Sequence, residues 1–159
     1  MTNDSTPAEV AGTRSALLGG IARSWQELQD VVRDLDERRL SAPGPDGWSV
    51  KDHLTHLARW EQYLLATIED RDAVAALGLP ADQERTETAV NAALHRLDAG
   101  RSPEEAQRLL VEAHVQVLAG LEALDEAGLQ HHLAHIEGNT SGHFDEHRAW
   151  IAGLLTTQR

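Results

Sequence analysis

The stretch GWSVKDHLTHLARWEQYLLATI (residues 47–68) contains both a helix start and a helical apolar stripe. Ser49 followed three residues later by Asp52 is a capping pair, in which each side chain accepts a hydrogen bond from the other residue's backbone N–H. That start is followed by apolar side chains at helical spacing, namely Val50, Leu57, Trp60, Leu64 and Ile68. The stretch therefore predicts an amphipathic helix with one face in a protein core.

The same signals predict three further long helices. Residues 6–9 (TPAE) and 102–105 (SPEE) each place a capping hydroxyl before a proline and a glutamate, which is typical of a helix start. Apolar residues then recur every three or four positions as far as Leu35 in the first helix and as far as Leu124 in the third. A fourth helix is predicted from about Thr140 to near Leu155.

The segments between these helices set the predicted topology. Residues 41–47 (SAPGPDG) break the chain with two prolines and two glycines. Residues 69–87 look irregular, a short helical piece follows around residues 88–97, and residues 125–139 are interpreted as a connector. These features predict an all-α fold, a four-helix bundle in a single domain (residues 1–159) with a long crossover between its second and third helices. That crossover is long enough for the second and third helices to run parallel.

Composition excludes several classes of function. The chain has 26 acidic and 14 basic residues, a formal charge of −12, so its surface repels nucleic acid and anionic membranes. It has no cysteine, and hence no disulfide, thiolate nucleophile or Cys-ligated zinc. The first residues do not resemble a signal peptide, and no apolar run reaches the roughly 18–20 residues of a membrane-spanning helix. We therefore expect a cytoplasmic protein.

Histidine is the unusual residue type, with nine in the chain. His143 and His147 lie one turn apart in the fourth predicted helix, on the side of Trp150, Ile151 and Leu154, which we take as the core side. This spacing lets a helix present two nitrogens to one metal ion. Alternatively, each imidazole simply forms a hydrogen bond to a neighbouring group, and the spacing leaves both interpretations open.

Other histidines are candidates for the same cluster. His53 and His56 both lie near the edge of the second helix's stripe, and periodicity does not choose between them. His114 faces inward on the third helix and is a weaker candidate for a pocket residue. The remaining histidines fall in connectors or on polar faces and are expected to be solvated: His95, His131, His132 and His135.

Two motifs carry a resemblance to a known family. GWSVKDHLTHLARWE (residues 47–61), followed far downstream by GHFDEHRAWI (residues 142–151), resembles the DinB-like superfamily of four-helix-bundle proteins. Within it, the layout is similar to the ClbS/DfsB group and to the bundle domain of mycothiol-dependent maleylpyruvate isomerases. The family's ligand on the second helix corresponds to the histidine eight residues after Trp48. The resemblance thus implies a metal-binding triad of His56, His143 and His147, with His53 as a pocket residue.

A triad of neutral imidazoles leaves open positions on an ion, which is the layout of catalytic metal sites. Zn²⁺, Ni²⁺ and Fe²⁺ all suit such ligands, so the metal is not determined. Trp60 and Asn91 are weaker pocket candidates; a core tryptophan and a surface asparagine are the plainer interpretations. The segment from His143 to His147 also fits a short protease motif in which Glu146 is the general base, but Glu146 projects away from the two histidines and is expected to be solvated.

The resemblance implies thiol-dependent transfers or isomerisations that use a low-molecular-weight thiol as co-substrate. The leading hypothesis is therefore a divalent-metal-dependent enzyme, a transferase or hydrolase acting on a small electrophilic substrate. One alternative is a self-resistance protein that sequesters a reactive small molecule, with metal incidental. Another is a helical association module with structural histidines. The apolar run at residues 150–155 suits either a homodimer contact or the core.

Overall fold

The fold is all-α, as predicted. The computed structural model describes residues 7–158, with side chains from residue 12 on, and contains no strand over that range. The helices are α1 (Pro7–Val32), α2 (Glu37–Ser41), α3 (Val50–Ile68), α4 (Ala73–Ala76), α5 (Glu87–Asp98), α6 (Pro103–Ala123), α7 (Glu126–Asn139) and α8 (Ser141–Thr157). Within this range, no helix combines the length and apolarity that crossing a membrane requires.

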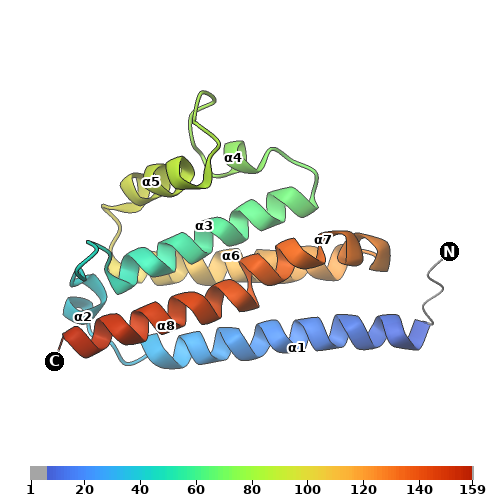
Figure 1. The fold of residues 1–159 in the computed structure, drawn as a ribbon, viewed down its shortest axis with the longest axis horizontal. Helices are drawn as coiled ribbons and strands as arrows, with labels where there is room; N and C mark the ends of the chain where they lie inside the picture. Colours follow the sequence, from blue (N-terminus) through green and yellow to red (C-terminus); the bar gives the residue numbers. More distant parts are fainter. Residues whose placement is uncertain (1–6, 159) are drawn as a thin grey trace.

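The long helices α1, α3 and α6 pack lengthwise with the consecutive helices α7 and α8 (Figure 1). Helices α3 and α6 run in the same direction, and α1 and α8 run opposite to them (Figure 1). The crossover between α3 and α6 carries α4 and α5 along the outer side of α3. A parallel pair needs such a long return, so the crossover length predicted from the sequence is the feature that permits this topology.

Helix starts follow the capping signals in the sequence. Ser49 and Asp52 form a full capping box at the start of α3, and Ser102 and Glu105 form one at the start of α6. Pro103 occupies the first turn of α6, as predicted. The contacts predicted for residues 6–9 lie outside the described residues and side chains, although α1 does begin at Pro7.

The structure corrects two predicted boundaries. The first long helix ends at Val32 instead of continuing to Leu35, and the short helix α2 follows it. Residues 126–139 form helix α7 and are not a connector, so the four predicted helices are not reproduced one for one. The signal for α7 is weak, since its buried apolar residues are Leu129 and Ile136 and it contains two glycines.

Thr140 separates α7 from α8. Its hydroxyl donates a hydrogen bond to the Ile136 carbonyl at 2.6 Å, and its backbone leaves the helical region with φ −125° and ψ −103°. Thr140 is itself fully buried. The bond satisfies one of the carbonyls left free at the end of α7, and the break lets α8 begin a new helix directly at Ser141.

Candidate metal centre

Two neighbouring helices supply the histidines of the candidate site. His53 and His56 come from the first two turns of α3, and His143 and His147 come from the first two turns of α8. Residues three or four apart lie on the same face of a helix, so each pair points one way. Because α3 and α8 pack against each other, the two pairs meet between them.

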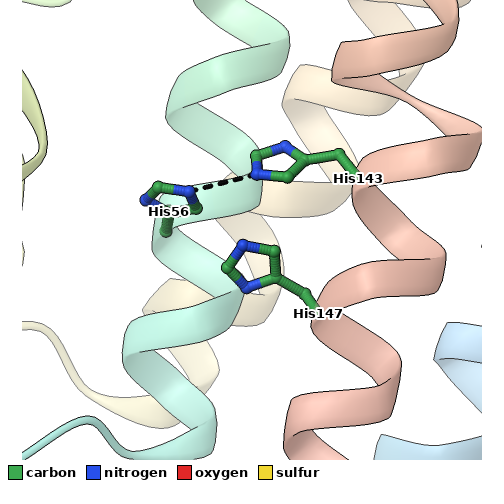
Figure 2. Close-up of side chains that lie close together, drawn as sticks. All are labelled: His56, His143 and His147. Atoms are coloured by element: carbon green, nitrogen blue, oxygen red, sulfur yellow. Dashed lines mark hydrogen bonds between the residues drawn. The ribbon is translucent and has the colours of Figure 1, made fainter. Parts of the chain in front are cut away.

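The imidazoles of His56, His143 and His147 converge. Figure 2 shows His56 reaching from α3 toward the two histidines of α8. The Nε2 atoms of His56 and His143 are 3.1 Å apart, and one nitrogen from each of the three rings lies within 4.8 Å of the other two. Two nitrogens bound to one tetrahedral ion at about 2.0–2.1 Å lie about 3.3 Å apart. The closest pair, which forms a hydrogen bond here, is therefore already near the spacing of shared ligands.

A hydrogen bond to His53 occupies one of the two ring nitrogens of His147. The Nδ1 atoms of His53 and His147 are 2.9 Å apart and form a buried hydrogen bond. Nε2 is therefore the nitrogen of His147 that remains for a metal ion. A hydrogen bond at the other nitrogen is the usual way in which a ligating imidazole is held in one orientation. By contrast, Nδ1 of His143 is buried without a partner among the described residues.

Burial keeps the imidazoles neutral. Desolvation, with the neighbouring His143 and His53, lowers the pKa of His56 to about 3. Desolvation lowers the pKa of His143 to about 4, and it also lowers the pKa values of His147 and His53. Neutral imidazole is the form that binds metal, because its lone pair is free. The donor set and its spacing thus fit a divalent transition metal ion.

The histidines form the floor of a cavity of about 710 Å³. His147 and His53 are 2% and 5% exposed, whereas residues on the opposite side of the cavity are open to solvent. Trp48 from the loop before α3 and Trp150 from α8 supply aromatic walls. His56, His143 and His147 would hold such an ion, and a small molecule in the cavity could reach it, because these histidines line the cavity.

Comparison with known families identifies the chain. A sequence model of the DinB superfamily matches residues 21–156, which includes all of these histidines. This chain belongs to the DinB superfamily. No curated protein and no solved structure gave a significant match.

The DinB-superfamily bundle brings only some of the other predicted pocket residues to the cavity. His53 and Asn91 line it. Trp60 lies beside it, half-buried, and its indole N–H donates a hydrogen bond to Oδ1 of Asn91 at 2.9 Å. His114 is not brought to the cavity: it is buried between helices, hydrogen-bonded to Glu61 at 2.8 Å and stacked on Trp25 at 3.8 Å.

The histidines expected to be solvated differ from one another. His131 and His135 are exposed on α7, as expected, and His132 is partly exposed. His95 is half-buried because its ring stacks on Trp48, with 5.1 Å between the ring centroids. It therefore supports an aromatic wall of the cavity, a role that its position in a polar stretch gave no reason to expect.

Sequence reasoning missed several residues of the cavity wall and misplaced one of them. Trp150 is 52% exposed and lines the cavity, so the prediction that it faces the core with Ile151 and Leu154 is wrong. Glu146 is exposed, as predicted, yet it lies on the cavity wall. Asp46 and Glu87 carried no sequence signal, because their proximity to the histidines depends on how the loop and α5 pack against α3.

Proposed function

We propose that this protein is a divalent-metal-dependent enzyme that acts on a small electrophilic molecule in the cavity above the histidines. The reaction would be transfer of sulfur from an external low-molecular-weight thiol, or hydrolysis. The observation that carries the proposal is the convergence of three imidazoles at the floor of an open cavity. A structural ion, in contrast, is normally enclosed by four protein ligands.

His56, His143 and His147 would hold the ion. When bound there, a divalent ion supplies Lewis acidity, which polarises a substrate oxygen or makes a bound water or thiol a better nucleophile. The chain has no cysteine, so any sulfur nucleophile must come from a second substrate. The three imidazoles do not select among zinc, nickel and iron.

Other side chains of the cavity would bind and orient the substrate. Trp60 occupies Oδ1 of Asn91, so the amide NH₂ group of Asn91 is the part available to donate a hydrogen bond. Trp48 and Trp150 give the cavity apolar faces that displace water from a bound molecule. Binding through these groups would place a substrate between the aromatic walls, with its reacting end toward the histidines.

The aromatic walls also favour a second candidate function. A cavity of about 710 Å³ lined by two tryptophans has the size of a small-molecule site even without an ion. The alternative is therefore sequestration of a reactive small molecule, with metal incidental. The two proposals differ in one observable: sequestration survives removal of metal by a chelator, and catalysis does not.

Elemental analysis of protein purified without a histidine tag tests the leading proposal. We expect about one equivalent of a transition metal per chain, lost in a His56→Ala variant and retained in a His131→Ala control, because His131 is exposed on α7. Turnover of electrophile and thiol pairs should fall with metal content and return on reloading. Absence of metal in every form, even after reconstitution with zinc, nickel or iron, would reject the enzyme proposal in favour of sequestration.

A further inference from the structure

Carboxylates surround the mouth of the cavity. Among the described residues that line it, three are acidic: Asp46 in the loop before α3, Glu87 in the first turn of α5, and Glu146 on α8. All three are exposed, whereas the histidines lie deeper. Because the carboxylates come from three separate parts of the fold, the negative rim is a product of the tertiary structure and not of one acidic run.

Among the residues whose side chains are described, no lysine or arginine at the cavity offsets this rim. Lys51, on the adjoining turn of α3, donates instead to the carbonyls of Ala99 and Arg101, each at 3.1 Å. Arg148, next to His147, forms ion pairs with Glu27 and Asp145. The basic residues nearest to the site in sequence are therefore directed elsewhere.

The aromatic walls complement the same charge. The face of an indole ring attracts a cation, with the strongest attraction among the aromatic side chains. Trp150 is half exposed at the cavity; Trp48 also lines it, with one face of its ring covered by the stacked ring of His95. Carboxylates and indole faces together are the groups that recognise ammonium ions.

A metal ion bound by the histidines would reduce the net negative charge of the cavity without making it positive. A divalent ion adds two positive charges, and the three rim carboxylates carry three negative charges. The two charges are also separated, because the three ligand histidines are more buried than the exposed carboxylates. The cavity then has a positive floor and a negative mouth, so a ligand with a cationic end has one favoured orientation.

We propose that the cavity selects small aromatic or aliphatic molecules that carry an ammonium or guanidinium group, and that it binds this group at the rim formed by Asp46, Glu87, Glu146 and the two tryptophans. The part of the inference that directs the ligand's other end to the histidines rests on the proposed function. The same rim repels substrates with net negative charge, including thiols that carry several carboxylates.

Matched probes without metal-binding groups test the selectivity. Benzyltrimethylammonium, phenylmethanesulfonate and neutral benzyl alcohol share one ring and differ in charge. Binding is followed by NMR through the indole N–H signals of Trp48 and Trp150, assigned with Trp→Phe variants, in chelator-treated and in zinc-supplemented protein. We expect the ammonium probe to bind about tenfold or more tightly than the sulfonate, with a difference that shrinks at high salt.

Paired variants assign the effect to the rim. Glu87→Gln with Glu146→Gln should weaken binding of the ammonium probe about three- to tenfold, the effect of removing two solvent-exposed charges. Glu112→Gln with Glu137→Gln removes the same net charge from exposed positions on α6 and α7, and should leave the preference unchanged. Equal effects of the two pairs, equal binding of ammonium and sulfonate, or an ammonium probe that shifts neither tryptophan would each overturn the proposal.

The outcome is independent of the metal test. A protein without metal that still prefers the ammonium probe refutes the proposed enzyme but retains the selective cavity. A protein with metal but without this preference retains the proposed enzyme and refutes the selectivity.

Discussion

Replacing His53 tests whether it holds His147 in the orientation that binds metal. The Nδ1 atoms of the two residues are 2.9 Å apart and buried. When Nε2 of His147 binds an ion, its Nδ1 must carry the proton and donate to Nδ1 of His53. Without an ion, the two rings can exchange the roles of donor and acceptor. The hydrogen bond is therefore required more strongly in the metal-bound state.

The loss of metal affinity depends on how much more the metal-bound state needs this hydrogen bond than the metal-free state does. In a His53→Leu variant, the bound state leaves the N–H of His147 buried without an acceptor, which costs about 1–3 kcal/mol. The free state avoids part of this cost by changing tautomer. We therefore expect metal affinity to fall about 10- to 100-fold, the usual effect of losing such a partner of a ligand. A His53→Asn variant supplies an amide oxygen as acceptor and should recover most of the affinity.

Competition with a chromophoric chelator measures the affinities of these variants for zinc. His95→Ala is the matched control: His95, like His53, packs against Trp48, and no ring contact among the described residues joins it to His56, His143 or His147. Circular dichroism and thermal melting check that each variant remains folded. If His53→Leu binds zinc as tightly as the wild type, or if the asparagine and leucine variants are equally weakened, the proposed positioning role of His53 is refuted.

Two further predictions concern buried acidic groups. Asp98→Asn should destabilise the fold by about 3–5 kcal/mol in denaturant titrations at pH 7, because Asp98 is 3% exposed and accepts two hydrogen bonds from Arg59. Burial alone would raise the pKa of Asp98, but the neighbouring arginines outweigh burial and lower this pKa. The stability advantage of the wild type over Asp98→Asn should therefore be present above about pH 4 and be lost in stronger acid. A difference in unfolding free energy that stays constant as the pH falls would contradict this reasoning. Burial raises the pKa of Glu61 despite its hydrogen bond with His114, so the wild type should lose stability as pH rises above the usual pKa of a glutamate. Glu61→Gln should therefore melt at a higher temperature than the wild type at pH 8 and at nearly the same temperature at pH 4, and a variant less stable at both pH values would refute this reasoning.

Most of the helices follow from local signals in the amino-acid sequence. Capping pairs and apolar stripes are local signals, because a helix satisfies its own backbone hydrogen bonds and shows its buried face every three or four residues. Helix α3 was predictable to its ends for this reason. Helix α7 was not, since its short stripe of Leu129, Leu133 and Ile136 becomes a covered face only when the rest of the bundle packs against it.

The candidate site likewise combines features that are local in the sequence with features that depend on helix packing. The spacing of His143 and His147 within one helix is a local property, and the family resemblance pointed to His56 as their partner. That all three nitrogens lie within 4.8 Å of one another depends on how α3 packs against α8. His114 is buried, as predicted, but it is hydrogen-bonded to Glu61 and does not line the cavity.

The residues that surround the histidines are brought there by helix packing, which no local pattern in the sequence indicates. Asp46, Glu87 and Glu146 are far apart in the chain, and no helical period relates them. Trp150 shares a helix with Ile151, yet one faces the cavity and the other the core, because α8 has a different neighbour on each side. A periodic pattern of apolar residues indicates that one face of a helix is covered. Which residues cover that face depends on the packing of helices that are distant in sequence. The same packing brings the three carboxylates to this cavity and so gives it its negative charge.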